Sequence, residues 1–348
     1  MWYYSIKETF NKFPRILIFI ILIFIQKNNK KLYKKYCFLD DEVDLNISNF
    51  YFLKDKNVSF SKNRKDTDCL ILITQFNFLS FLKNIIYLKR MRVVGVNYFG
   101  HYGINMLINI GYFDFSNAAL REKYKEESHN NYKNLNRILN QDELYVLGNS
   151  PEFSRIIEEI NSKPVFICND SISMLEGIKS SIIVLSFADP LFHFSYDESA
   201  LNFINSIKKI EGEIDYLIVP SSAIPIIKNA KINANLIGVT SSKKMQENFK
   251  IKNDKIYTKN THNVLTQYML PVAASLSKRI ILGAVTLELE SELNSVWAYD
   301  KNIGEATDKS FAFKYSFFKD RNFKQYYRYH NKMLKKILKE NPNIKLYE

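Results

Sequence analysis

The sequence predicts an α/β protein built on a mostly parallel sheet. Three observations lead to this fold class: short apolar runs of strand length recur after residue 140, helix-length segments separate them, and small polar turns follow several of the runs. Alternation of this kind is typical of parallel sheets covered by helices on both faces. The runs are residues 144–147, 165–168, 182–186, 216–219, 234–239, 279–282 and 344–347.

The region before residue 140 also carries strand and helix patterns. Residues 68–74 and 91–96 are apolar and strand-like, and the apolar segment 76–88 between them has the length of a helix, which together indicate a β-α-β unit. The polar run 121–140 predicts an exposed helix. We therefore expect an N-terminal α/β region of unknown role over residues 37–140, a boundary near Asn140, and a second domain over residues 141–348.

Composition indicates a globular chain in a reducing compartment. The 348 residues are 46% hydrophobic and 14% aromatic, enough for a packed core. The three cysteines, Cys37, Cys69 and Cys168, are odd in number, widely spaced and without a CxxC pair. This favours the cytosol and supports neither a disulfide framework nor a zinc site.

The positive charge is concentrated at the N-terminus. Residues 1–36 hold eight Lys or Arg against Glu8, which gives +7 of the formal +13. These charges flank the apolar run 16–25, about ten residues long, whereas a spanning helix needs roughly 17 to 25. No small-residue cleavage site follows it. We expect residues 1–36 to form a basic, membrane-proximal helix lying on the anionic inner leaflet; a true span and a buried core helix are the alternatives.

The turn after the run 144–147 has the character of a phosphate-binding loop. Gly148, Asn149 and Ser150 follow the apolar residues, and Pro151 stands where a helix would begin. Glycine lets the backbone leave the strand, and free amides at a helix start attract anions. We take Gly148, Asn149 and Ser150 as nucleotide-binding candidates; an ordinary strand-turn-helix connection is the alternative.

Two further polar turns are predicted at the same edge of the sheet. Asn169 and Asp170 follow the run 165–168, and Asp189 follows the run 182–186. Ligands of open parallel sheets bind beyond the carboxyl ends of the strands. An asparagine amide there can bond a base, a ribose or a phosphate, although asparagine is also a common turn former.

A third group precedes the helix-like run 264–276. Thr261 or Asn263 could cap that helix, with His262 between them, and direct free amides at an anion. A plain helix cap is the alternative.

His330 is the candidate catalytic base. It lies near the start of the last predicted helix, beside Tyr326 and Arg328, and ahead of the strand 344–347. A neutral imidazole can take a proton from a hydroxyl nucleophile near pH 7. The alternative for His330 is an ordinary surface histidine. The tyrosine and basic side chains beside it could bind phosphate or simply be solvated.

Several enzyme classes lack their signatures here. The chain has no GKS or GKT loop, no GxGxxG, no GxSxG and no HExxH, and no DxD follows a predicted strand. We therefore expect neither a metal nor another cofactor. The aromatic residues are not interleaved with a basic stripe, so nucleic acid is not an expected partner.

The order of these motifs resembles that of the bacterial lipooligosaccharide sialyltransferases of glycosyltransferase family 42. Over about 200 residues, the sequence LGNSP at 147–151 is similar to the family's GNGPS loop, and CND at 168–170 is similar to its CNQ turn. The DP at 189–190 matches an NP or DP turn. WAYD at 297–300 is similar to YAFD, and Tyr329-His330, followed by a helix and IKLY, is similar to the segment with the catalytic histidine.

The resemblance implies a Rossmann-like sheet of the GT-A-variant type and a metal-independent, inverting transfer of a CMP-activated acidic sugar. Asn149 and Asn169 would contact CMP, and His330 would deprotonate the acceptor hydroxyl. Asp189, Trp297, Tyr299, Tyr326 and Arg328 would line the substrate or phosphate site. The expected partners are a nucleotide sugar, a cell-surface glycan or lipid-linked acceptor, and the cytoplasmic face of the inner membrane.

The sequence also departs from the family pattern. Ser150 replaces the loop's second glycine, Glu152 replaces its serine, and GAVTL at 283–287 lacks the family's GxDFY. Thr261-His262-Asn263 is closer to the TH(D/N) of 6-hydroxymethylpterin diphosphokinase-like relatives. A nucleotide enzyme of that kind and a non-catalytic member of a glycan assembly complex are therefore the alternatives. The oligomeric state stays open.

Overall fold

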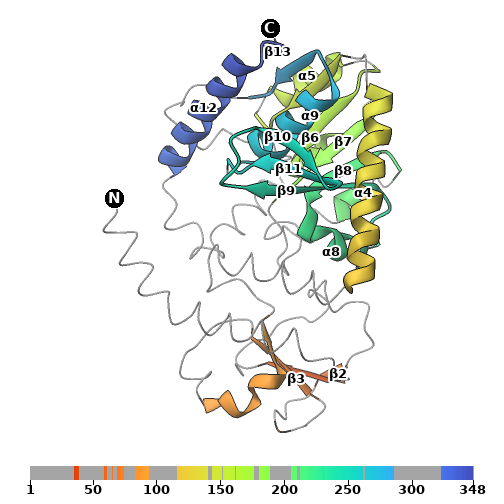
Figure 1. Cartoon of the computed structure of the whole chain (residues 1–348), viewed down its shortest axis with the longest axis vertical. Coiled ribbons are helices and arrows are strands. Elements are labelled where there is room, and N and C mark those ends of the chain that lie inside the picture. Colours follow the sequence, from red (N-terminus) through yellow and green to blue (C-terminus); the bar gives the residue numbers. More distant parts are fainter. Residues whose placement is uncertain are drawn as a thin grey trace.

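A computed structural model describes the chain as two sheets with covering helices (Figure 1). The described residues are 35–38, 59–60, 65, 69–73, 83–93, 116–139, 143–150, 152–160, 162–175, 180–188, 205–209, 212–229, 231–261, 263–285 and 323–347.

The larger sheet has nine strands in the order β10-β11-β9-β8-β7-β6-β5-β12-β13. Every neighbouring pair is parallel except β10 and β11, which confirms the predicted mostly parallel α/β architecture. Each of the seven predicted runs overlaps a strand. The strands are β5 (Leu144–Leu147), β6 (Val165–Cys168), β7 (Ile183–Ser186), β8 (Tyr216–Pro220), β9 (Asn235–Ser242), β10 (Phe249–Lys252), β11 (Lys255–Lys259), β12 (Ile280–Gly283) and β13 (Ile344–Leu346).

Both faces of this sheet are buried, because alternate side chains of each central strand enter different cores. Leu144 and Val146 of β5 enter one core, whereas Leu147 enters the other. The Leu147 face is covered by α5 (Phe153–Glu159) and α8 (Ile224–Asn229). The Val146 face is covered by α4 (Ala118–Leu139), by the π-helical turn η5 (Leu265–Met269) that continues into α9 (Leu270–Leu276), and by α12 (Phe323–Glu340).

Helix α4 is the predicted polar helix, but one of its sides is buried. Tyr132 and Leu135 enter the core of the nine-stranded sheet. Two of its polar residues bond the backbone of β9: Ser128 Oγ accepts the Gly238 amide at 2.7 Å, and Asn131 Nδ2 donates to the Leu236 carbonyl at 3.0 Å. The expectation of an exposed helix is therefore corrected. Two of its polar residues bond the backbone of the larger sheet. Although α4 precedes the predicted boundary at residue 140, it packs on the sheet that follows the boundary.

Two strands of the larger sheet were not predicted from the sequence. β10 and β11 form a hairpin whose two loop residues, Asn253 and Asp254, both have positive φ, at 50° and 56°. Asn and Asp tolerate that conformation in tight hairpin turns. The alternation Phe249-Lys-Ile-Lys before the Asn-Asp pair was the available signal.

The smaller sheet has the order β2-β1-β3-β4, with parallel neighbours throughout. Its strands are β1 (Lys35–Phe38), β2 (Ser59–Phe60), β3 (Cys69–Ile73) and β4 (Met91–Val93), and the 3-10 helix η2 (Ile85–Arg90) precedes β4. The parallel pairing of β3 with β4 agrees with the predicted β-α-β unit. β1 begins before residue 37, so the end of the predicted basic segment 1–36 enters this sheet.

The apolar run 16–25 lies outside the described residues. Among the residues that the structure does describe, no helix is both long enough and apolar enough to cross a membrane.

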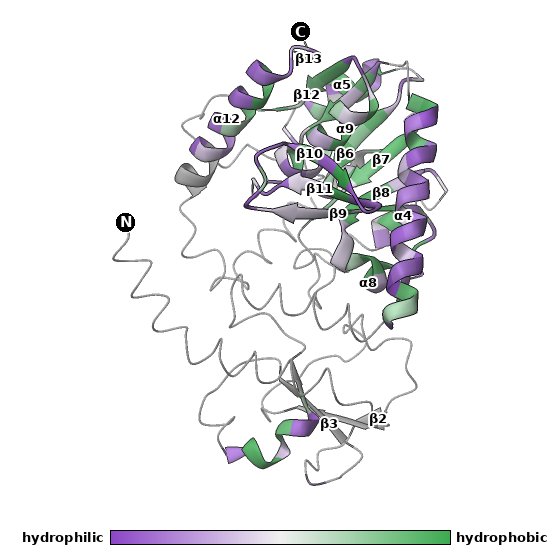
Figure 2. Cartoon of the chain, in the orientation of Figure 1, coloured by the Kyte–Doolittle hydropathy of each residue, from purple (hydrophilic) through white to green (hydrophobic). Residues whose placement is uncertain are grey.

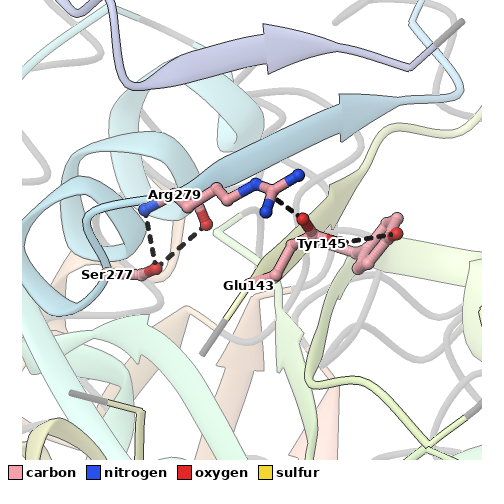
Figure 3. A network of polar contacts seen from close by, with 4 residues as sticks. All are labelled: Glu143, Tyr145, Ser277 and Arg279. Atoms are coloured by element: carbon pink, nitrogen blue, oxygen red, sulfur yellow. Dashed lines mark hydrogen bonds and ion pairs between the residues drawn. The ribbon is translucent and has the colours of Figure 1, made fainter. Parts of the chain in front are cut away.

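A polar network ties β5 to β12 at their amino ends (Figure 3). Arg279 Nε donates to Glu143 Oε2 at 2.7 Å, and the Tyr145 hydroxyl donates to Glu143 Oε1 at 3.0 Å. Ser277 Oγ accepts the Arg279 amide and donates to its carbonyl. Burial, with the neighbouring Glu143 carboxylate, raises the pKa of Tyr145 to about 12, so the phenol keeps its proton and donates at all physiological pH values.

The bond between α4 and β9 can be tested with Ser128→Ala. The change leaves the buried Gly238 amide without its acceptor, so we expect the free energy of unfolding to fall by about 1–3 kcal/mol. Asn130→Ala, at an exposed position of the same helix, is the matched control and should change stability by less than about 0.5 kcal/mol. Urea denaturation of both variants is the measurement, and equal midpoints would contradict the role of Ser128.

Candidate functional site

The strand order of the larger sheet reverses between β5 and β12. From β5 the chain proceeds to β6, β7, β8 and β9 on one side, whereas β12 pairs with β5 on the other side and is followed by β13. Ligands of open parallel sheets bind outside the carboxyl ends of the strands at such a switch point. The predicted loop at Gly148–Ser150 lies directly after β5 and is therefore at this position.

The loops after β5 and β12 bond to each other. The Gly148 amide donates to the Gly283 carbonyl at 2.9 Å, and the Ser150 amide donates to the Ala284 carbonyl at 3.1 Å. The sequence predicts free amides here, and this expectation is corrected for these two groups. Helix α5 begins only at Phe153, with Glu152 as its N-cap residue, and Pro151 lies outside the described residues.

Gly148 is needed for this loop contact. A Cβ atom added to it would lie 2.3 Å from the Ala284 carbonyl oxygen and 2.9 Å from Val285 Cγ1. Any side chain at position 148 would push the two loops apart. Gly148 therefore allows the backbones of the loops after β5 and β12 to come into contact. The sequence suggests only that it lets the backbone turn away from the strand.

Asn149 and Ser150 present polar atoms that are buried without a partner. Neither the amide oxygen nor the amide nitrogen of Asn149 has a hydrogen-bond partner among the described residues, and the same holds for Ser150 Oγ. A buried polar group without a partner costs about 1–3 kcal/mol, so most such groups are satisfied. Three such atoms in consecutive residues make this loop the candidate site for a polar ligand.

The same edge holds two residues in the left-handed backbone region. Asn169, directly after β6, has φ 50°, and Ala284, directly after β12, has φ 52°. Alanine adopts this conformation only where its surroundings impose it, and such residues cluster at binding sites. Nothing in the residue type of Ala284 predicts a positive φ, so the sequence alone does not indicate this position.

Asn169 and Asp170 begin the 3-10 helix η3 (Asn169–Met174), which continues from β6. The turn is held by Ser171, whose Oγ accepts the Cys168 amide at 3.2 Å and donates to the Cys168 carbonyl at 2.6 Å. Since β6 is the neighbour of β5, at a spacing of about 4.8 Å, Asn149 and Asn169 lie at one edge, as predicted. The Asp170 side chain is not among the described ones.

Thr261 and Asn263 form the start of the helix that covers the Val146 face. Asn263 Oδ1 accepts the Leu265 amide at 2.9 Å, and the Thr261 hydroxyl bonds to the Thr266 hydroxyl at 2.8 Å. These are the bonds of a plain helix cap, which was one of the two alternatives. The group connects β11 to η5, which packs against β6, β8 and β11 on the Val146 face of the sheet. His262 lies outside the described residues.

His330 is buried on the inner side of α12. It lies one turn before Leu334 and two turns before Ile337, both in the core, and is 9% exposed. Burial lowers its pKa to about 4, so the imidazole is neutral at pH 7. Its Nδ1 has no hydrogen-bond partner among the described residues. Because the unfolded chain takes up this proton near pH 6.5, the burial of His330 lowers stability progressively as the pH falls from 6.5 to 4.

The height of His330 along the sheet follows from the register. α12 runs opposite to the strands it connects, since β12 and β13 are parallel and Ile280 is paired with Ile344. From His330 to Glu340 the helix rises about 15 Å, and from Ile280 to Ala284 the strand rises about 13 Å. The two rises are similar, which favours a position of His330 near the carboxyl edge of the sheet.

The other predicted substrate contacts are less defined. Asp189, Trp297 and Tyr299 lie outside the described residues. Tyr326 belongs to α12, but its side chain is not among the described ones, and Arg328 is exposed on the same helix.

A hollow of about 420 Å³ lies between β10, α9, α12 and the start of β13. Its lining is largely apolar, with Phe249, Leu270 and Ile337 among the residues, and contains none of the predicted site residues. In the part of the chain that the structure describes, no group of three or more His, Cys, Asp or Glu could hold a metal ion.

The chain matches no protein-family model, and no curated protein matches it.

The Asn149 side chain offers a direct test of the site. Asn149→Leu replaces an unpartnered buried amide by an apolar group of similar size, so the free protein should gain stability, by about 1 kcal/mol or more. The variant should also lose stabilisation by any nucleotide that protects the unaltered protein. Thermal denaturation with and without the nucleotide measures both effects. A destabilised variant that still binds would show that the amide has a structural role.

Proposed function

We propose that the chain is a metal-independent glycosyltransferase that binds a CMP-activated acidic sugar at the carboxyl edge of β5, β6 and β12 and transfers the sugar to a glycan or lipid-linked acceptor. The observation that carries the proposal is the unpartnered, buried amide of Asn149 at the switch point. The choice of a CMP-activated sugar as the donor rests on the resemblance of the sequence motifs to glycosyltransferase family 42.

Three features of the site support nucleotide binding there. The loops after β5 and β12 are in contact, so the edge is preorganised. Asn149 and Asn169 stand at adjacent strand ends and can offer both donors and acceptors to a base, a ribose or a phosphate. Parallel sheets of this order bind ligands at this position.

His330 supplies the acid-base chemistry in this proposal. The acceptor oxygen attacks the anomeric carbon, the bond from that carbon to the CMP phosphate oxygen breaks, and the acceptor proton passes to the neutral imidazole. With a pKa of about 4, His330 is a weak base in the free protein. A phosphate bound at the same edge stabilises the protonated imidazole and raises that pKa, so donor binding strengthens the base. Direct displacement needs the acceptor oxygen and the anomeric carbon about 3 Å apart and in line.

A pterin-diphosphokinase-like enzyme is the second candidate, favoured by the sequence Thr261-His262-Asn263. Such an enzyme needs magnesium beside its nucleotide. The hydrogen bonds of Thr261 and Asn263 serve a helix cap, which gives this candidate less support than the transferase receives from Asn149.

A nucleotide panel separates these functions. Thermal denaturation of the full chain with CMP, UDP, GDP and ATP, each with and without magnesium, should show stabilisation by CMP alone and without magnesium. Saturation at about 100 times the dissociation constant would add about 2.7 kcal/mol. Stabilisation by ATP only with magnesium would favour the kinase-like enzyme, and no stabilisation by any nucleotide would favour the non-catalytic alternative.

The role of His330 is tested by His330→Ala. Transfer should fall at least ~100-fold while CMP binding stays unchanged, because a general base acts on the acceptor hydroxyl and not on the nucleotide. In the unaltered protein, protonation of His330 removes the base, so the acid limb of kcat/KM, which reports the free enzyme, should lie near the pKa of about 4, and the acid limb of kcat should lie at higher pH because the bound phosphate raises that pKa. Unchanged transfer by the variant would remove His330 from the mechanism.

A further inference from the structure

Helix α12 carries an excess of basic residues that the proposed chemistry does not use. Between Phe323 and Glu340 it has six Lys or Arg and a single acidic residue, Glu340, which gives a net charge of +5. In Figure 2, hydrophilic residues (purple) and hydrophobic residues (green) alternate along the helix. A helix with one apolar side is expected on a sheet, but the charged residues of this helix are almost all basic.

Four of these lysines form one exposed stripe, which we call the α12 lysine face: Lys332, Lys335, Lys336 and Lys339. Their spacing of three and four residues places them on the same side of the helix. Leu334 and Ile337 occupy the opposite side and are buried in the core. The apolar side of α12 is therefore already used by the fold, and its basic side faces solvent.

The charges of this face are little compensated within the helix. Lys336 Nζ lies 3.6 Å from Glu340 Oε1, and both side chains are at least half exposed, so this pair contributes little. Helix α4 is different. It holds five basic and three acidic residues, and its ion pairs include Lys123 with Glu127 and Lys125 with Glu122.

Exposed apolar residues accompany the lysines in the α12–β13 unit. Tyr329, one turn before Lys332, is 45% exposed, and Leu346 of β13 is 41% exposed beside the exposed Lys345. β13 is the last strand of the larger sheet in the described part of the chain. Lysine ammonium groups suit a diffuse layer of headgroup phosphates, and tyrosine and leucine suit the interfacial region below them.

We propose that the α12 lysine face, flanked in the sequence by the exposed Tyr329 and Leu346, docks on the surface of a bilayer that contains anionic lipid. This contact is made by the folded domain, separately from the anchor predicted for residues 1–36, and it does not depend on which reaction the protein performs. Juxtamembrane lysines gain energy only from the anionic component, within about a Debye length of the surface.

The test is vesicle co-sedimentation of the full chain with phosphatidylcholine alone or mixed with phosphatidylglycerol. The variant in which Lys332, Lys335, Lys336 and Lys339 are all replaced by Gln should bind the anionic vesicles about 10-fold more weakly or worse at low salt. Its binding to neutral vesicles should equal that of the unaltered protein, because the substitutions remove charge alone. At about 1 M salt, where the Debye length is about 3 Å, the two proteins should bind anionic vesicles equally.

A matched variant removes four charges from α4, with Lys123, Lys125, Lys133 and Arg137 replaced by Gln. It should keep most of its affinity for anionic vesicles. This control shows whether binding depends on where the charges lie or only on the net charge of the protein. Both variants should keep the circular dichroism spectrum of the unaltered protein, since the residues changed on α12 are all exposed.

Three results would overturn the proposal: an unchanged affinity of the α12 variant for anionic vesicles, an equal loss in both variants, or a loss on neutral vesicles as well. Tight binding of a nucleic-acid duplex that the α12 variant loses, with vesicle binding unchanged, would assign the face to a different polyanion.

Discussion

The pairing of β5 with β12 is the constraint on which the candidate site depends. The two strands are more than 130 residues apart in the sequence, yet their ladder runs from Ile280 opposite Leu144 to Gly283 opposite Leu147. At the amino ends, Glu143 and Arg279 hold them through a charged hydrogen bond. At the carboxyl ends, the carbonyls of Gly283 and Ala284 accept the amides of the β5 loop. A one-residue slip would reverse every side chain of β12 and separate these loops.

Three of the buried polar atoms without a partner among the described residues lie at the carboxyl end of β5. Along the strands, both faces are filled by apolar side chains, and the polar groups of α4 satisfy the backbone of β9. At the switch point, Asn149 and Ser150 carry unpartnered buried atoms, and Ala284 has a positive φ. Each of these features destabilises the free protein by about 1–3 kcal/mol, and in the proposed function a bound nucleotide would offset this cost.

The parallel strands follow from a local pattern of residues. Apolar runs of four to six residues became these strands, because a strand buried on both faces needs an apolar residue at almost every position. Features that depend on contacts between distant segments were not predicted. The polarity of α4 gave no sign that Ser128 and Asn131 bond to β9, and the β10–β11 hairpin was missed because its lysine-rich alternation has little apolar content. His262, Asp189, Trp297 and Tyr299 stay predictions.

The sequence by itself determined the α/β class, most of the strands, and the polar turns of Gly148–Ser150 and Asn169–Asp170 that follow two of them. These follow from residue type and spacing, which act over a few residues. Only the tertiary structure decided which turns meet. It placed Asn149 next to Asn169 at the switch point, used Thr261 and Asn263 in a helix cap, and buried His330, which lowers its pKa to about 4. Strand order and burial arise from contacts between distant segments, and no single stretch of the sequence contains them.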